Sequence, residues 1–387
     1  MIAMSWLVYR LTNSAFMLGL VGFVSRVPML FISPFAGVIA DKLDKYKLLL
    51  LTQILSMLQA LIITVLLFTN VIQIWHIIVL GIFLGLINSF DMPTRQSFVI
   101  EMIEKKEDLG NAIALNSAMV NGARLFGPTI AGILVAVVGE GWCFLINTLS
   151  FIGIITTLLM MKIPPKKIEN RTSSHLKELK DGFSYAFNFL PIRYILLLLA
   201  IVSLMGMPYQ VLMPVFAKDI FNGGPHTLGY LMTAVGSGAL IGALYLASRK
   251  SVLGLGRIIA IASGIFGLSL VFFALSKSYF LSLMILAFTG FGMMVQMASS
   301  NTVLQTIVDD DKRGRIMSFY AMAFMGTVPF GNLLAGSMSD LIGTTNTVLY
   351  GGICCILGAA LFALKLPVIR KLIRPIYISK DILPVEM

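Results

Sequence analysis

Two arginines, Arg26 and Arg124, lie inside long apolar stretches of the chain. A guanidinium is always charged, and placing it near the centre of a bilayer costs at least about 2.5–3.5 kcal/mol. On a helix, Arg26 would share a face with glycines and Ser33, and Arg124 would share one with Asn121 and Pro128. We expect one arginine to bind or couple to an anion. Snorkelling, or a structural hydrogen bond to a carbonyl, is the alternative for each.

Other polar or aromatic residues in such stretches could line a central cavity together with Arg26. They are Asn88, Asn116, Asn147, Tyr209, Gln210, Gln296, Tyr320 and Asn332. No carboxylate lies in the middle of an apolar stretch, so the sequence offers no obvious proton carrier. We take Asp340, at the end of one stretch, as the candidate proton site, with a plain loop carboxylate as the alternative.

Several other chemistries are excluded by residue type and spacing. The three cysteines and three histidines have no C-x-x-C pattern and no partners at metal-ligand spacing, so we expect no metal and no cofactor. No G-x-x-x-x-G-K-[ST] motif is present, which excludes a self-contained ATP pump. No nucleophile, base and orienting group share a recognisable motif, so we do not expect an enzyme.

The composition of the chain indicates the environment in which these polar and charged residues lie. Of 387 residues, 58% are hydrophobic and 12% are charged, against roughly 25% charged in a soluble domain. The sequence therefore predicts an integral membrane protein, and the long apolar runs, which do not alternate as barrel strands would, make it all-α. The net charge of +11 does not indicate nucleic acid, because the basic residues form short clusters between apolar runs.

Eleven apolar windows are long enough to cross about 30 Å of hydrocarbon as helices. They are 14–40, 47–69, 74–92, 111–138, 141–161, 193–217, 226–247, 257–276, 279–299, 315–340 and 343–366. The apolar segment Met1–Tyr9 is too short to cross, and we expect it to be the outer half of a twelfth helix that begins upstream. The alternative is a genuine eleven-span protein.

Positive charge predicts the orientation of these spans. Of the 29 lysines and arginines, 24 lie in one set of alternate connections, and only Arg10, Lys218 and Lys277 lie in the other set. The positive-inside rule makes the rich set cytoplasmic. We therefore expect a multi-pass protein of the plasma membrane with its C terminus and its central connection in the cytoplasm.

The two halves of the chain resemble each other at a shift of 204 residues. Five residues, Phe126, Gly127, Ala131, Gly132 and Gly139, then match Phe330, Gly331, Ala335, Gly336 and Gly343. We expect four parts: an N-terminal helix bundle at 1–161, a cytoplasmic linker with an interfacial helix at 162–192, a second bundle at 193–366 and a cytoplasmic tail at 367–387.

Two repeated six-helix halves are typical of the major facilitator superfamily. The segment from Gly37 to Lys47, GVIADKLDKYK, is similar to that superfamily's G-x-x-x-D-R-x-G-R signature, with Asp44 in place of a glycine. The segment from Gly127 to Gly132, GPTIAG, resembles the antiporter signature of drug exporters, except at Ala131. Further segments, Asp91–Gln96, Asn121–Arg124, Asn301–Gln305 and Arg313–Arg315, look like the enterobactin-exporter branch.

The resemblance implies two mechanical sites. The first is a conformational latch of alternating charges at helix ends, formed by Gly37, Asp41, Lys42, Lys45, Asp91 and Arg95; an ordinary solvated loop is the alternative. The second is the antiporter-like motif Asn121, Arg124, Gly127, Pro128 and Gly132, where small residues would let helices approach closely and seal one route. A helix kink without directional meaning is the alternative.

These expectations define a secondary active transporter. We expect it to export an amphipathic small molecule, siderophore or drug-like, by alternating access driven by protons, and to act in the bilayer as a monomer. The alternatives are a proton-coupled nutrient importer and a non-transporting truncated remnant. The substrate class comes from the resemblance, not from composition.

Overall fold

The computed structural model describes residues 2–101, 109–161, 188–249, 251–380, 382 and 383. Among the residues whose side chains lie outside this description are Gly37, Asp41, Lys42, Asn116, Asn121 and Arg124. The expected linker helix at 162–192 falls mostly outside the described residues. Within the described parts all regular structure is helical, as the composition predicts.

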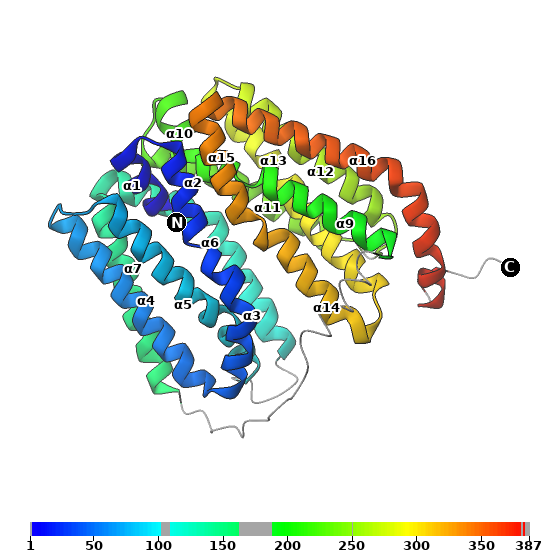
Figure 1. Cartoon of the computed structure of the whole chain (residues 1–387), viewed down its shortest axis with the longest axis horizontal. Helices are drawn as coiled ribbons and strands as arrows, with labels where there is room; N and C mark the ends of the chain where they lie inside the picture. The colour runs from blue at the N-terminus through cyan, green and yellow to red at the C-terminus, as the bar shows by residue number, and fades with distance from the viewer. Residues whose placement is uncertain (1, 102–108, 162–187, 250, 381, 384–387) are drawn as a thin grey trace. The chain divides into compact units, whose positions relative to one another are not determined.

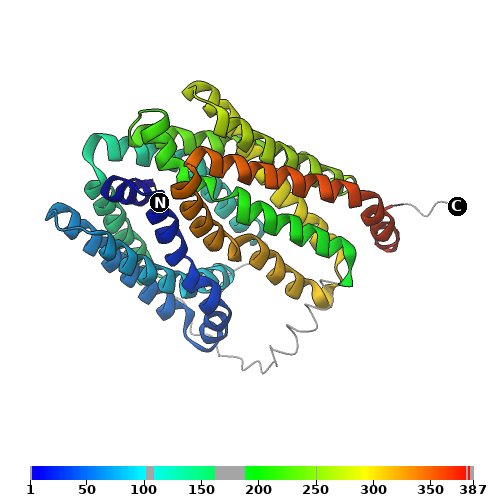
Figure 2. The same ribbon diagram turned by 45° about the horizontal axis from the view of Figure 1, so that its top comes forward.

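Figure 1 shows the helices of the first half in blue to cyan-green. They are α1 (Ile2–Thr12), α2 (Ala15–Val24), α3 (Val27–Lys42), α4 (Lys45–Phe68), α5 (Ile74–Glu101), α6 (Leu109–Val138) and α7 (Glu140–Met160). Helix α4 packs against both α5 and α7, and Figure 2 shows this group turned by 45°.

The helices of the second half follow from residue 190. They are α9 (Leu190–Ile201), η2 (Val202–Gly206), α10 (Tyr209–Val215), η3 (Phe216–Ile220), α11 (Pro225–Ala247), α12 (Leu255–Leu275), α13 (Tyr279–Ile307), α14 (Asp310–Ala321), η4 (Met322–Gly326), α15 (Val328–Ile342) and α16 (Thr344–Ser379). The three η segments are π-helical turns, which often mark functional sites. Helix α12 packs against α13 and α16.

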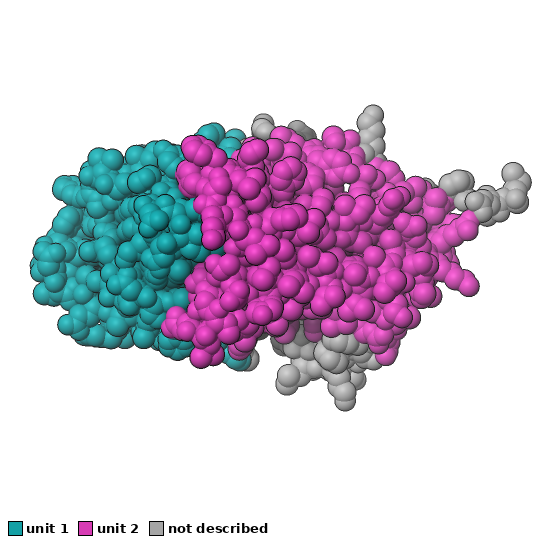
Figure 3. Space-filling view, turned by 90° about the horizontal axis from the view of Figure 1, so that it is seen from above, with its two compact units in different colours: residues 1–172, 211–233 teal, residues 173–210, 234–387 magenta. Residues whose placement is uncertain are grey.

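The chain divides into two compact units, which Figure 3 colours separately. Unit 1 comprises residues 1–172 and 211–233, and unit 2 comprises 173–210 and 234–387. Segment 211–233, although it follows the midpoint of the sequence, thus packs with the helices of the first half. The four sequence-based parts stay a prediction.

Nine helices of the described chain are long and apolar enough to cross a membrane. Two of the eleven expected windows have no counterpart among these nine. In the fourth, α6 is helical over the whole window, from Leu109 to Val138, and its apolar part among the fully described residues is Leu125–Val138. The tenth divides into α14, η4 and α15, with Pro329 in the first turn of α15, where a missing N–H is tolerated.

The first and last expected spans also differ from the structure. The first is interrupted at Ser25 and Arg26, because Pro28 starts a new helix in the first turn of α3. The last does not end at Leu366, since α16 continues through Pro367 to Ser379. Lys380 holds its end, donating from Nζ to the carbonyls of Thr306 (2.8 Å) and Val308 (3.2 Å).

The internal repeat predicts that Gly139 and Gly343 have the same backbone conformation. Both glycines have φ of +86°, and each directly precedes a helix, α7 or α16. Such a φ is strained for residues with a Cβ, so glycine is needed at both positions. The two halves therefore share this helix start in conformation as well as in sequence.

Candidate functional site

Asp91 is a residue of the expected latch whose contacts the structure describes in full. It lies on α5, is 8% exposed, and its Oδ1 accepts hydrogen bonds from Thr52 Oγ1 (2.9 Å) and Gln53 Nε2 (2.6 Å) on α4. Its Oδ2 accepts from Arg95 Nη2 at 2.7 Å, one helical turn later. The carboxylate thus ties α4 to α5 and leaves Arg95 half exposed.

The loop before α4 contributes a helix cap. Asp44 accepts backbone hydrogen bonds from Tyr46 (3.0 Å) and Lys47 (3.3 Å) and so caps the N-terminus of α4. This accounts for an acidic residue where the signature has glycine. The side chains of Asp41 and Lys42 are outside the description, and Gly37 lies with them in α3, so pairing across the latch stays a prediction.

The antiporter-like segment lies where α6 meets the first part of α11, residues 225–233, which belongs to unit 1 as α6 does. A Cβ added at Gly132 would lie 2.8 Å from Gly229 Cα and 2.8 Å from the Pro225 carbonyl oxygen. A Cβ added at Gly229 would lie 2.8 Å from the Pro128 carbonyl oxygen. The two backbones are therefore in direct contact, as small residues at a helix interface permit.

A pair of hydroxyls reinforces this contact: Thr129 on α6 is hydrogen bonded to Thr233 on α11. Around Gly127, in contrast, an added Cβ would meet nothing within 4 Å. The sequence motif includes Gly132, but Gly229, Thr129 and Thr233 could not be found from the sequence, because their partners are about a hundred residues away.

Helix α1 makes polar contacts with the segment 211–233. The Tyr9 hydroxyl donates to Asp219, and Lys218 Nζ donates to the Asn13 side chain while lying 5.3 Å from the centre of the Tyr9 ring. Tyr9 is buried, whereas Asp219 is exposed. The pairing could not be found from sequence, because both partners look like loop residues flanking spans.

Arg10 and Glu140 form a further ion pair in unit 1. Arg10 Nε lies 2.8 Å from Glu140 Oε1, with side-chain exposures of 50% and 12%. The geometry makes this a charge contact without a well-aligned hydrogen bond. It connects α1 with the start of α7.

The proposed cavity residues of unit 1 are not brought together as buried groups. Arg26 lies in the break between α2 and α3 and is partly buried, whereas Asn88 and Asn147 are exposed. The Asn116 side chain is outside the description. These residues thus stay candidates without a common polar network among them.

In unit 2 the candidate cavity residues Tyr209, Gln296, Tyr320 and Asn332 are buried, and Gln210 is partly buried. The Tyr320 hydroxyl donates to the Met297 carbonyl at 3.1 Å. Buried polar atoms without a hydrogen-bond partner in the described chain include Tyr209 Oη and Gln296 Nε2, and also Ser299 Oγ and Ser300 Oγ.

Gln296, Ser299 and Ser300 lie within about one turn of α13, so they form one polar patch on that helix. Leaving buried polar atoms unpaired costs free energy, so the patch is a reasonable place for a polar ligand group. Gln296 was predicted from the sequence, whereas the two serines were not, because serines are common in membrane helices.

Asp340, the candidate proton site, is exposed near the end of α15. In the described parts of the chain no group of three or more His, Cys, Asp or Glu side chains could hold a metal ion.

Comparison with known proteins identifies the family. Residues 1–375 match the family model described as transmembrane secretion effector. The staphyloferrin A transporter of Staphylococcus aureus is 28% identical, with 92% of this chain and 89% of that protein covered. The multidrug efflux pump Tap of Mycolicibacterium fortuitum is 25% identical (96% and 92% covered), and macrolide efflux protein A of Streptococcus pyogenes is 21% identical (89% and 86%).

Solved structures support the same fold. A bacterial homolog of the human lysosomal transporter Spinster, inward-facing and occupied, superposes with a TM-score of 0.71 at 13% identity, covering 96% of this chain and 93% of that one. The POT family transporter PepTSo gives a TM-score of 0.67 at 14% identity, covering 96% and 95%. The chain therefore belongs to the transmembrane secretion effectors of the major facilitator superfamily, and it is a multi-pass membrane transporter and not an enzyme.

Proposed function

We propose that this transporter exports an amphipathic small molecule, siderophore or drug-like, by alternating access driven by protons moving inward. One observation carries the proposal: relatives that match about nine-tenths of the chain are a staphyloferrin A transporter and two efflux proteins. Their lengths are covered almost completely as well, so the match extends over the whole transport fold.

The direction of transport is supported by the contact of α6 with α11. Gly132 and Gly229 bring two backbones together in the antiporter-like segment. Such packing closes a route tightly, and in an exporter it would close the outer route while substrate enters from the cytoplasm. Asn121 and Arg124, one to two turns before Pro128, would complete this motif.

In this proposal the latch controls the exchange between the inward-open and outward-open states. Its residues are Gly37, Asp41, Lys42, Lys45, Asp91 and Arg95. The buried and fully bonded Asp91 supports this assignment, because it holds α4 and α5 as one body on which the loop charges can pair and separate. Arg26 and the candidate residues Asn88, Asn116, Asn147, Tyr209, Gln210, Gln296, Tyr320 and Asn332 would line the substrate cavity, with the α13 patch as its most polar wall.

The remaining assignments follow the charge pattern of the sequence. The linker at 162–192 and the C terminus would be cytoplasmic, the protein would act as a monomer, and Asp340 would carry the proton. Protease added to intact cells should then leave the linker uncut. Cleavage there would show that the linker is outside the cell and that the predicted orientation is wrong.

Efflux from energised cells tests the function directly. Cells that express the full chain are loaded with a siderophore or a cationic drug from a panel, and loss of the compound is followed with and without an uncoupler. We expect efflux that the uncoupler abolishes. Uncoupler-dependent accumulation would instead indicate an importer, and no change for any compound would favour a remnant.

The proton site is tested in the same assay with Asp340→Asn, and with Asp44→Asn as the matched control, since both change an exposed carboxylate to an amide. Loss of proton-driven efflux in the first variant alone supports the assignment. Equal efflux in both variants would remove Asp340 from the mechanism.

A further inference from the structure

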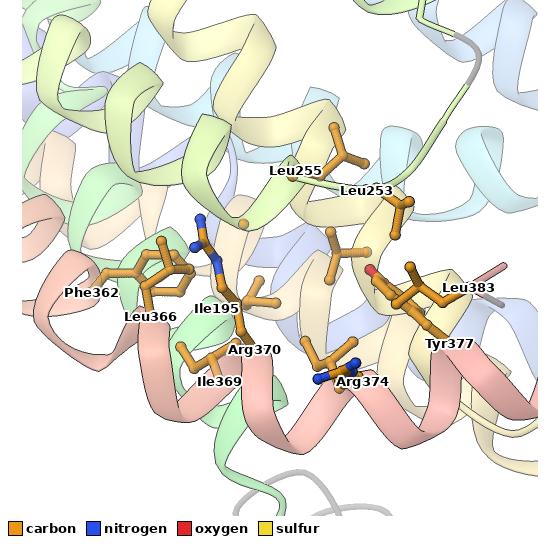
Figure 4. Close-up of a pocket in the computed structure, with 14 residues that line it drawn as sticks. Ile195, Leu253, Leu255, Phe362, Leu366, Ile369, Arg370, Arg374, Tyr377 and Leu383 are labelled. Carbon is orange, nitrogen blue, oxygen red and sulfur yellow. The ribbon is translucent and has the colours of Figure 1, made fainter. Parts of the chain in front are cut away.

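A groove in unit 2 lies outside all the sites described above. It has a volume of about 270 Å³ and lies between α9, the start of α12, α13 and the last four turns of α16. Its walls are mainly apolar, with Ile195, Leu255, Val303, Phe362 and Ile369 among them. Figure 4 shows Ile195, Leu255, Phe362 and Ile369 around the groove, with α16 along one side.

Two arginines, Arg370 and Arg374, are the charged residues of this groove. They lie one turn apart on α16, and Figure 4 shows the Arg370 side chain extending from the helix into the groove. Arg370 forms no hydrogen bond or ion pair with residues that the structure describes. From Thr344 to Ser379 α16 contains four basic residues and no acidic residue, so the positive charge has no counterpart on that helix.

The length of α16 places the groove at the membrane surface. Its 36 residues span about 54 Å, whereas about 20 residues cross the hydrocarbon core. A helix that enters the core near Thr344 leaves it near Leu364. Arg370 and Arg374 then lie at the level of the lipid headgroups.

The face of α16 opposite the groove is apolar and exposed. Leu361, Leu364 and Val368 are 62%, 73% and 47% exposed, as expected for residues that contact lipid. The groove is near the lower end of the volume range for ligand pockets, so it can hold part of one acyl chain while the rest lies in the bilayer.

The far side of the groove is closed by the chain itself. After α16 the backbone turns, and the N–H groups of Ile382 and Leu383 donate to the Tyr377 carbonyl at 2.9 and 3.2 Å. Leu383 thereby lines the groove. Together with Lys380, which is bound to the carbonyls of Thr306 and Val308, this turn fixes the end of α16 against α13.

We propose that this groove is a binding site for an anionic phospholipid, with the phosphate on Arg370 and Arg374 and part of one acyl chain among the apolar walls. Arginine suits this role because its planar fork donates two parallel hydrogen bonds to a phosphate. Basic pockets between membrane helices at the headgroup level bind anionic lipids by the same combination.

The test compares lipids on the purified full chain. After delipidation in detergent, bound lipid is counted by native mass spectrometry during titration with phosphatidylglycerol or phosphatidylcholine. We expect phosphatidylglycerol to bind at least about tenfold more tightly, since each basic residue adds to the attraction of an anionic headgroup. Equal binding of the two lipids would overturn the proposal.

Paired variants distinguish a built site from general attraction. Arg370→Gln/Arg374→Gln removes two charges from the groove, and Lys365→Gln/Lys371→Gln removes two charges from the same helix outside it. We expect the arginine pair to lose about tenfold in phosphatidylglycerol affinity and the lysine pair to change less than about twofold. Equal loss in both would show that only net charge matters and would reject the site.

Two further measurements cover the remaining outcomes. Arg370→Lys keeps the charge but loses the planar fork, so it should bind with intermediate affinity even if the double variant does not fold. Wild-type affinity in this variant would contradict a two-pronged phosphate contact. Inorganic phosphate at millimolar concentration should not displace the lipid; full displacement would indicate a site for free anions and overturn the lipid assignment.

Discussion

The two ends of unit 1 are held together in different ways. At one end, where α4 begins, Asp91 accepts from Thr52, Gln53 and Arg95, all on α4 and α5. At the other end, helices α1 and α6 contact the segment 211–233 through Tyr9 with Asp219 and through Gly132 with Gly229. The first set of bonds joins neighbouring helices of one half of the sequence, and the second set joins residues about 100 to 210 positions apart.

Aromatic and apolar packing distinguishes these ends as well. Leu49, Phe98 and Leu158 form a buried cluster at the Asp91 end, whereas the Phe68 and Trp142 rings meet edge to face, 5.5 Å apart, at the opposite ends of α4 and α7. The Asp91 end therefore behaves as a fixed part of one bundle. The Tyr9 end depends on contacts between segments far apart in the sequence, and we expect these contacts to break during transport.

The largest expected effect is at the contact of α6 with α11. In Gly132→Leu the side chain would collide with the backbone of Gly229 and Pro225, which cannot move aside without separating the helices. We expect export to fall about tenfold or more, since overpacking costs about 1–3 kcal/mol. Gly122→Leu on the same helix is the matched control, because a Cβ there meets nothing within 4 Å. Equal loss in both variants would mean that the contact has no special role.

The next effect concerns Asp91. In Asp91→Ala the buried Gln53 amide loses its acceptor, and the free energy of unfolding should fall by about 2 kcal/mol. Asp91→Asn should cost less, because it keeps an acceptor oxygen. Thermal unfolding of the purified protein in detergent measures both. If stability were unchanged while export stopped, Asp91 would act on transport alone and the Asp91 end would not be a fixed part of the bundle.

A smaller effect is expected for Tyr9→Phe, which removes the hydrogen bond to Asp219. Because Asp219 is exposed, we expect a change of about 1 kcal/mol. This change should affect how often the contact opens, and not the free energy of unfolding. Opening is measured with a single cysteine, Thr129→Cys, in a protein that lacks Cys143, Cys354 and Cys355. The alkylation rate of this cysteine should be about fivefold higher when Tyr9 is replaced by Phe. Unchanged labelling would remove Tyr9 from the contact that opens.

The smallest effect is expected for Arg10→Gln. Its ion pair with Glu140 is half exposed on the arginine side, and exposed pairs contribute about 0–1 kcal/mol. Export and unfolding temperature should both stay close to those of the unchanged protein, and any difference should shrink in high salt. A loss as large as that of Tyr9→Phe would show that α7 takes part in opening as well.

Much of the fold could be predicted because a bilayer imposes local rules. Long uncharged apolar runs must be helical there, so the membrane class, most spans and the repeated glycines Gly139 and Gly343 followed from the sequence alone. The family signatures also lie in short segments that can be read without a structure.

Interruptions and contacts were decided only by the tertiary structure. The break at Arg26, the π-helical turns and the continuation of α16 past Pro367 depend on how each segment packs and on what satisfies its backbone groups. The same holds for the acceptors that surround Asp91 and for Gly229 opposite Gly132. A sequence records which residues are small or polar, but their partners lie on other helices, and hydrophobic periodicity contains no information about which helices meet.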